Sequence, residues 1–468
     1  MNFRSLKTIL IVVGRGFIAK SILRSGVLTE LKKSGHRIVL LFWSVHGQPM
    51  PDTLRREFAS DNVIVETVLT PRISRWHRRF RILTALLVYN ENNRKFRYLA
   101  TGGNRFVFWF KKISCSNLAK IEVLKRLARW AEEKIFKTEN FTLWFEQYRP
   151  NLVFSTSVIS SVDIEFMKEA KRRGVKIVSM PRGWDNVGTI FYKVMPDLLL
   201  VQNEMMKRDA VTFQRFVEER VKVVGFPQFD WYRRPEILQT REDFFRTRQL
   251  DPAKKLILWG STGRLTQQSV SICNLLTRAV QAPEELIRPS QLLIRAHFSD
   301  VKNNRFDYLK GNRAVAIDDN ITRSDFFYDG VDPGIEEIIG LANTLYHADL
   351  VIVQSSTLSL DALCYDKPVI NTAYGGLYDG LGRDITPILY TENCYRPLID
   401  LGAVTLAENE TALLVAINQY LENPALHRAE RARALAVLAH RVDGRASRRI
   451  ADAILSLLMN HESARFCN

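Results

Sequence analysis

The sequence predicts an α/β protein with two domains, each built on a parallel sheet. Short apolar runs, such as residues 6–13 and 350–353, alternate with amphipathic helical segments along most of the chain. This alternation is typical of parallel strands joined by right-handed helical crossovers. The chain of 468 residues is longer than one core usually supports, and the alternation breaks between Trp231 and Pro252. We therefore expect a first domain over residues 1–235 and a second over 236–468.

The elements of the first domain follow from its apolar runs and helical periodicity. In chain order they are strand 6–13, helix 18–33, strand 37–42, a basic helical region, helix 118–136, strand 150–157, helix 162–173, strand 175–180, strand 196–201, helix 204–217 and strand 220–224. The first three elements form a Rossmann-like βαβ unit.

The turn after the first strand contains Gly14, Gly16 and Ala19, which match a G-x-G-x-x-A dinucleotide pattern. A dinucleotide site also needs an acid at the end of the second strand to hold the ribose. Phe-Trp-Ser occupies that place, at residues 42–44. We therefore expect Gly14 and Gly16 to make a tight turn on the wall of a ligand cleft, and we do not expect nicotinamide to bind.

Residues 72–130 carry much of the excess positive charge. The chain has a formal net charge of +17, and this region holds fifteen Lys and Arg against Glu91 and Glu122, with ten aromatic residues interleaved. A solvated helical face is one interpretation. An anionic membrane surface or an anionic sugar acceptor is the interpretation that we favour. Nucleic acid is not expected, because no nucleic-acid-binding motif accompanies the charge.

Composition indicates a cytoplasmic protein, free or peripheral on the inner face of the membrane. The five cysteines form no C-x-x-C pair and no metal-binding spacing, as is usual for reduced thiols. No apolar run approaches the roughly 20 residues of a membrane span. Residues 6–13 are short and lead directly into a glycine turn, so we do not expect a signal peptide.

The second domain is expected to repeat the same alternation after residue 254. Its elements in chain order are strand 255–259, helix 268–280, strand 291–296, an irregular polar stretch over 303–334, helix 334–346, strand 350–353, a short helix, a strand from Val369, and helices 407–422, 426–439 and 445–460. 

Residues 349–372 form the segment in this domain that most favours a ligand. Ser355, Ser356 and Thr357 follow the buried strand 350–353, where a helix should begin. Hydroxyl caps and free backbone N–H groups at such a place favour an anion, usually a phosphate. Ligands of open α/β sheets also bind at the carboxyl ends of strands. An ordinary strand–helix loop with serine caps is the alternative.

Two further strand ends should reach the same edge of the sheet. Gly260, Ser261, Thr262 and Arg264 follow the strand 255–259, and Arg295 and His297 follow the next strand. We interpret Arg295 as a phosphate clamp, because its guanidinium is a rigid fork of donors. An ordinary surface arginine is the alternative.

Four segments resemble the two-domain GT-B glycosyltransferase superfamily, and the resemblance covers most of the chain. Residues 223–230 (VVGFPQFD) are similar to a V-x-G-x-P-x-x-D segment that closes the first domain in several members, and residues 349–372 to the donor-binding unit. Residues 293–297 (LIRAH) are similar to a strand end of CDP-glycerol glycerophosphotransferase relatives, although Phe298 replaces their proline. Residues 183–186 (GWDN) are similar to a segment of bacterial surface-polysaccharide proteins.

The resemblance implies two Rossmann-like domains that face a central cleft and transfer a sugar, or a sugar-like phosphate unit, from a nucleotide-activated donor. The acceptor would be a glycan or lipid-linked molecule of surface polysaccharide biosynthesis, bound mainly in the first domain. No tightly held metal or cofactor is implied. Asp361 is a candidate for binding the donor ribose, with a favourable interaction with the helix dipole as the alternative.

An acceptor hydroxyl that attacks with inversion must lose a proton to a base in the first domain. Asp185 is the first candidate, because it follows a strand end, and His46 and His36 are alternatives. Trp184 and Asn186 in the same turn are candidates for acceptor contacts. A retaining reaction would need no base.

Two other functions stay open. Non-hydrolysing UDP-sugar 2-epimerases share the two-domain plan and the V-x-G-x-P segment, but they need several acids and histidines in the cleft, of which we find few. A sugar-binding scaffold without activity is the other alternative, although Ser355–Thr357 and Arg295 disfavour it.

Overall fold

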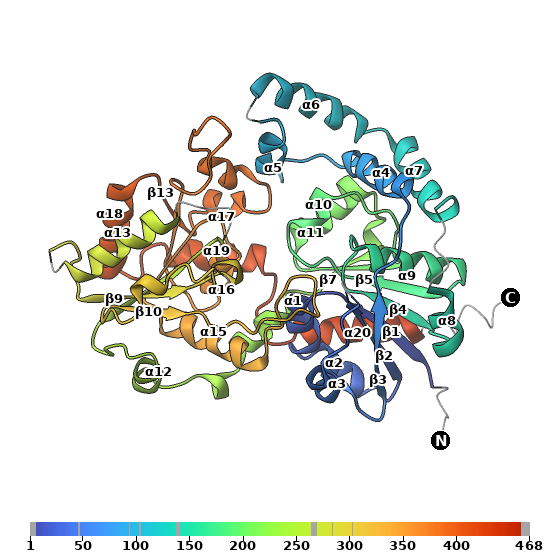
Figure 1. The fold of residues 1–468 in the computed structure, drawn as a ribbon, viewed down its shortest axis with the longest axis horizontal. Coiled ribbons are helices and arrows are strands. Elements are labelled where there is room, and N and C mark those ends of the chain that lie inside the picture. Colours follow the sequence, from blue (N-terminus) through green and yellow to red (C-terminus); the bar gives the residue numbers. More distant parts are fainter. Residues whose placement is uncertain are drawn as a thin grey trace.

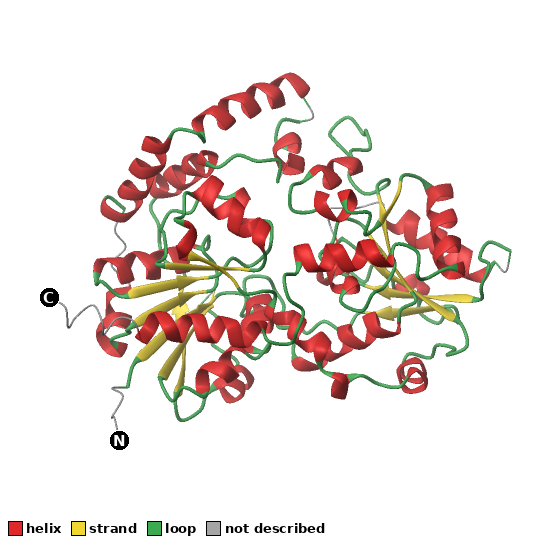
Figure 2. Ribbon diagram, turned by 180° about the vertical axis from the view of Figure 1, so that it is seen from behind, coloured by secondary structure: helices red, strands yellow, loops and turns green. Residues whose placement is uncertain are grey.

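The computed structural model describes residues 6–44, 47–92, 94–102, 104–136, 141–263, 269–282, 284–301 and 303–459. It contains one sheet of seven strands and one of six, each with helices packed around it (Figures 1 and 2). Every strand pair in both sheets is parallel. The predicted fold of two parallel-sheet α/β domains is confirmed.

The first sheet has the order β3-β2-β1-β4-β5-β6-β7 and the second the order β10-β9-β8-β11-β12-β13. The strands of the first sheet are β1 (Thr8–Val13), β2 (Arg37–Ser44), β3 (Val63–Leu69), β4 (Leu152–Ser155), β5 (Lys176–Ser179), β6 (Leu198–Val201) and β7 (Val221–Val223). Those of the second are β8 (Lys255–Gly260), β9 (Ser290–Arg295), β10 (Val315–Asp318), β11 (Leu350–Val353), β12 (Val369–Thr372) and β13 (Thr405–Ala407).

The continuous apolar sequence of β1 is explained by its central position. Leu10 lies between Val39 of β2 and Val153 of β4. Successive residues of a strand point to opposite faces, so Leu10 enters one hydrophobic core and Ile11 the other. Both residues are fully buried, as expected for a parallel strand covered on both faces.

Helices join the strands. They include α3 (Asp52–Phe58), α8 (Thr142–Tyr148), α9 (Ser161–Arg172), α10 (Asn186–Thr189), α11 (Glu204–Asp209), α12 (Arg241–Thr247), α13 (Ser269–Gln281), α14 (Phe298–Val301), α15 (Ile335–His347), α16 (Leu358–Leu363), α17 (Arg396–Asp400), α18 (Glu410–Glu422), α19 (Arg428–Leu438) and α20 (Ala446–Met459).

Several expected boundaries were wrong. Strands β3, β10 and β13 were not predicted. The helix expected over 18–33 is three pieces, α1 (Gly16–Ile18), a π-helix η1 (Ala19–Leu23) and α2 (Val27–Lys32). Gly26 has a φ of 125° in front of α2, and the chain turns there.

The last helix, α20, returns to the first sheet although the strands before it belong to the second. Ile450 and Ile454 of α20 are fully buried in the same core as Ile9 of β1. The carboxylate of Asp230 accepts hydrogen bonds from the backbone N–H groups of Ala446 (3.0 Å) and Ser447 (2.8 Å), at the start of α20. The acid of the V-x-G-x-P-x-x-D segment therefore holds this crossing helix in place.

The chain passes from one sheet to the other between β7 and β8, and a division at residue 235 stays a prediction.

A loop of the second domain, residues 319–334, packs on the first domain. Phe326 and Phe327 contact Phe42 at the end of β2, with ring centroids 6.4 and 6.0 Å apart. Tyr328 stacks on Trp43 at 5.6 Å. These aromatic contacts join the two domains beside the cleft.

The basic region forms an arm of helices on the outer edge of the molecule (Figure 1). The arm consists of α4 (Arg75–Thr84), α5 (Arg94–Leu99), α6 (Arg105–Leu118) and α7 (Glu122–Lys134), so the helix expected over 118–136 is mostly α7. Within the described part of the chain, none of the helices is long and apolar enough to cross a membrane.

Candidate functional site

A cavity of about 380 Å³ lies between the two domains, at the carboxyl ends of β8, β9 and β11. Seven of the predicted donor-binding residues line it: Gly260, Ser261, Arg295, His297, Ser356, Thr357 and Asp361. The first domain contributes Phe17, Lys20, Arg182, Gly183 and Trp184. We refer to this cavity as the cleft.

Ser261 fixes the relation between the ends of β8 and β9. Its hydroxyl donates to the carboxylate of Asp300 at 2.6 Å and accepts from the backbone N–H of His297 at 2.8 Å. The residue before Ser261 is a glycine, Gly260, and a Cβ at that position would lie only 2.8 Å from the side chain of Leu358. The turn is therefore held rigidly against the start of α16.

Arg295 projects from the end of β9 and pairs with Asp318 at the end of β10, at 2.5 Å. The ion pair fixes the guanidinium at the boundary of the cleft, which Arg295 lines. A second, larger cavity of about 750 Å³ is also lined by Arg295, and Asp318 belongs to its lining. Arg295 is therefore a fixed donor between two adjoining spaces.

His297 is held in place by Ser299. Its Nδ1 lies 2.9 Å from the hydroxyl oxygen and 3.3 Å from the backbone nitrogen of Ser299. Burial lowers the pKa of His297, although nearby Asp300 raises it. The neutral form of the ring is thus favoured on the wall of the cleft.

The three hydroxyl residues after β11 do not behave alike. Ser356 and Thr357 line the cleft, whereas Ser355 does not. The backbone N–H of Ser355 donates to the hydroxyl of Tyr390 at 3.2 Å, and its φ is 41°, in the left-handed region. Ser355 therefore shapes the turn that presents Ser356 and Thr357.

Asp361 lines the cleft, and its carboxylate accepts a hydrogen bond of 2.6 Å from the hydroxyl of Tyr232. Burial raises the pKa of Asp361, while the hydrogen bond from Tyr232 and the charges of Lys20 and Arg295 lower it. One of its oxygens is thus committed to a residue that follows the first sheet, which sequence reasoning did not foresee.

Lys20, like Arg182, is a charged lining residue that sequence reasoning missed. It lies on η1 in the first domain, and its environment contains Arg295, Asp361 and Glu337 of the second domain. Burial lowers the pKa of Lys20, and Arg295 lowers it further, while the two acids raise it. Lys20 directly follows Ala19 of the G-x-G-x-x-A pattern, and this position is the signal in the sequence that could have identified it.

The glycine turn faces the second domain and not the cleft. The backbone N–H groups of Gly16 and Phe17 donate to the carboxylate of Asp329 at 3.0 and 3.2 Å. A Cβ on Gly16 would lie 1.8 Å from the carbonyl oxygen of Val331, and one on Gly14 would lie 2.5 Å from Trp43. Gly14 and Gly16 thus allow close packing, and neither lines the cleft, contrary to our expectation.

The turn 183–186 is divided between two places. Trp184 lines the cleft and meets Tyr395 of the second domain edge to face, at 6.0 Å. The carboxylate of Asp185 accepts a hydrogen bond from the side chain of Asn186 at 3.0 Å, and neither of these two residues lines the cleft. The candidate base therefore lies beside the cleft wall.

The other candidates lie elsewhere. Thr262 adjoins the lining residue Ser261 but is not itself part of the lining. His36 is buried at the start of β2, where its Nδ1 accepts from the backbone N–H of Lys7. His46 and Arg264 lie outside the described residues.

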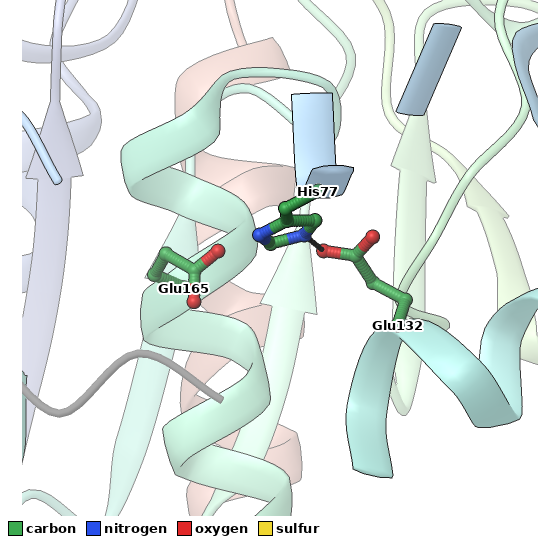
Figure 3. A group of neighbouring side chains, drawn as sticks. All are labelled: His77, Glu132 and Glu165. Carbon is green, nitrogen blue, oxygen red and sulfur yellow. Dashed lines mark hydrogen bonds and ion pairs between the residues drawn. The ribbon is translucent and has the colours of Figure 1, made fainter. Parts of the chain in front are cut away.

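His77, Glu132 and Glu165 form a buried group that resembles a metal site, because their ligand atoms lie within 4.8 Å of one another (Figure 3). Two cations already neutralise its carboxylates. Arg81 contacts both Glu132 and Glu165 at 2.5 Å, and Lys168 contacts Glu165 at 2.9 Å. The group is therefore an ion-pair network that joins α4 and α7 of the arm to α9.

No protein-family model matches the sequence, and no curated protein sequence matches it. Solved structures do match over nearly the whole chain. S. aureus MnaA in complex with UDP has a TM-score of 0.55 at 12% identity, covering 97% of both chains. UDP-GlcNAc 2-epimerase from Neisseria meningitidis, bound to UDP-GlcNAc, has a TM-score of 0.52 at 12% identity, covering 96% of this chain and 100% of that one. A variant of the wall teichoic acid polymerase TagF has a TM-score of 0.53 at 12% identity, covering 98% and 90%.

Identities this low establish the architecture alone. The chain has the GT-B fold, which it shares with UDP-GlcNAc 2-epimerases and a teichoic acid polymerase.

Proposed function

We propose that the protein is a glycosyltransferase that moves a sugar, or a sugar-like phosphate unit, from a nucleotide-activated donor to a glycan or lipid-linked acceptor. The observation that carries the proposal is the composition of the cleft. Three cations, Lys20, Arg182 and Arg295, line it with the hydroxyl residues Ser261, Ser356 and Thr357. Such a set of donors suits the diphosphate of a nucleotide sugar.

The chemistry follows from the charge that develops on the leaving diphosphate. Donors that are already fixed in place stabilise that charge without reorganisation, so they lower the barrier directly. The Arg295–Asp318 pair and the contacts between His297 and Ser299 provide this rigidity. These donors are protein groups, so the proposed reaction uses no tightly held metal or cofactor.

The acceptor we propose belongs to surface polysaccharide biosynthesis and is reached from a cytoplasmic position, peripheral on the inner face of the membrane. It would enter from the side of Trp184. Asp185 remains our candidate base for an inverting reaction, because it follows Trp184 directly. An Asp185→Asn variant should bind the donor normally and turn over at least about a hundredfold more slowly; retained turnover would remove Asp185 from the mechanism.

A UDP-sugar 2-epimerase is the second candidate, because the fold is shared with two UDP-GlcNAc 2-epimerase structures, one of them bound to UDP-GlcNAc. Among the described residues that line the cleft, the acids are Glu337 and Asp361, both from the second domain. Asp361 is bound to Tyr232, so the acid–base groups that epimerisation requires are sparse. This favours the transferase.

Incubation with UDP-GlcNAc alone separates the two candidates. An epimerase converts the sugar to its 2-epimer without an acceptor, and the transferase does not. Appearance of the epimer, detected by NMR, would overturn the transferase proposal. Transfer of radiolabelled sugar from a panel of UDP, CDP and GDP donors to a membrane lipid extract would support it.

A further inference from the structure

The helices of the arm, α4 to α7, expose large apolar side chains to solvent. On α6, Phe106 is 81% exposed and Phe110 66%, and Trp109 and Ile113 on the same side are exposed too. Spacings of three, four and seven residues place these four on one face of the helix. A helix that only supported the fold would bury this face.

The neighbouring helices expose apolar residues in the same way. Trp76 on α4 is 73% exposed. Ile82 and Leu83 on the same helix are 64% and 65% exposed. Val123, Leu127 and Trp130 form an exposed stripe on α7. A patch this rich in aromatic residues marks an interaction surface, because isolated monomers rarely expose one.

The charge on the arm is strongly one-sided. Among the described side chains of residues 72–130, the exposed ionic residues are all cations: Arg72, Arg75, Arg78, Arg79, Arg105, Lys111, Lys120 and Arg126. Glu91 is partly buried and pairs with Lys112, and Glu122 pairs with Arg215. The partner of this surface must therefore be anionic.

The inner side of the arm is firmly attached to the first domain. The network of His77, Arg81, Glu132 and Glu165 joins α4 and α7 to α9. Arg129 donates to the backbone carbonyls of Tyr192 (3.1 Å) and Gln214 (2.8 Å). The exposed face is thus presented outwards on a rigid support, with α6 at the edge of the molecule (Figure 2).

The apolar side chains of the arm decide which kind of anionic partner fits it. A cavity of about 370 Å³ beneath α6 is lined mainly by apolar groups, including Leu86, Val88 and Phe108, with Lys111 beside it. A lipid offers acyl chains for such groups and anionic headgroups for the lysines and arginines, whereas a nucleic acid offers no aliphatic partner. A second copy of the chain would bring like charges together.

We propose that the arm seats the protein on an anionic lipid bilayer, with Phe106, Trp109 and Phe110 of α6 entering the headgroup region. The inference rests on the peripheral position in the proposed function, but it concerns the arm and not the cleft. Lipid binding and nucleotide binding are measured separately, so either can fail while the other stands.

The test is flotation of the full chain with vesicles of phosphatidylcholine, with and without phosphatidylglycerol. We expect binding that requires phosphatidylglycerol and weakens as salt is raised. A triple variant, Phe106→Ser, Trp109→Ser and Phe110→Ser, should lose at least about tenfold in partitioning. The matched control replaces exposed apolar residues away from the arm, Leu143→Ser and Val415→Ser, and should bind as the wild type does.

Three results would overturn the proposal. The first is equal binding to vesicles without phosphatidylglycerol, and the second is unchanged binding by the triple variant. The third is a dimer, detected by sedimentation, that the triple variant abolishes. A nucleotide-induced thermal shift that persists in the triple variant shows that its cleft is intact, so a loss of lipid binding belongs to the arm.

Discussion

The hydroxyl of Tyr232 donates a hydrogen bond of 2.6 Å to the carboxylate of Asp361, and this bond joins the segment after the first sheet to the wall of the cleft. Both side chains lie where the domains meet. The position of Asp361 thus depends on a residue about 130 positions earlier in the sequence.

A Tyr232→Phe variant should lower the free energy of unfolding by about 1–3 kcal/mol, because it leaves a buried carboxylate without its donor. Urea unfolding followed by circular dichroism measures this. Tyr346→Phe, at a more exposed tyrosine, serves as the control and should change stability by less than about 0.5 kcal/mol. Equal effects of the two variants would show that the Tyr232–Asp361 bond contributes nothing specific.

Replacing Lys20 tests the contribution of the first domain to nucleotide binding. Lys20→Met should weaken binding of a nucleoside diphosphate about tenfold, because it removes a cation beside Arg295. Stability should be unchanged or higher, since the repulsion between Lys20 and Arg295 is lost. Isothermal titration calorimetry gives the affinity, and Lys33→Met, which removes an exposed lysine, is the control. Unchanged affinity with reduced stability would make Lys20 a structural partner of Asp361 only.

Glu132 should make the attachment of the arm sensitive to acid. Burial opposes ionisation, but hydrogen bonds from His77 and Arg81 hold the pKa of Glu132 at about 2, below its ordinary 4.5. The unfolded chain therefore binds more protons than the folded one between these values, and the stabilisation from Glu132 is lost as the pH falls from about 4.5 towards 2.

A Glu132→Gln variant should cost about 3–5 kcal/mol at pH 7, because it leaves Arg81 underpaired in a buried place. The difference from the wild type should shrink as the pH is lowered towards 3. Unfolding at several pH values measures it, with Glu133→Gln on the more exposed side of α7 as the control. A difference that is constant with pH would contradict the lowered pKa.

Asp230 should be required to hold α20 on the first domain. An Asp230→Ala variant loses two hydrogen bonds to the start of this helix, which should cost about 1–2 kcal/mol. It should also expose the C-terminal segment to limited proteolysis. Asp452→Ala on the exposed side of α20 is the matched control. Proteolysis at the wild-type rate would mean that packing alone holds the helix.

Local patterns in the sequence predict the buried inner strands well. The apolar run of β1 and the strand–hydroxyl–helix order after β11 are local signals, and both are present in the structure. The three missed strands, β3, β10 and β13, lie at sheet edges and are only partly buried, so they lack the continuous apolar run of the inner strands.

Contacts between distant segments account for what the sequence did not reveal. Nothing near Gly16 in the sequence indicates that Asp329 accepts its N–H, or that Val331 fills the space above it. Lys20 was overlooked for the same reason, since the charged groups around it, Arg295, Glu337 and Asp361, are about 275 or more residues away. The rule that parallel strands end at one edge of a sheet grouped the site residues of the second domain. The residues that the first domain contributes to the cleft could be identified only from the structure.

The most direct test of the central claim is binding of UDP, CDP and GDP to the wild type and to an Arg295→Gln, Ser356→Ala, Thr357→Ala variant, measured by thermal shift and calorimetry. Arg246→Gln, which removes an exposed arginine, is the control. If the cleft holds the donor diphosphate, at least one nucleotide raises the melting temperature of the wild type and of the control, and the variant binds it at least about tenfold more weakly. Absence of binding by all three nucleotides, or equal binding by the variant, would contradict the assignment.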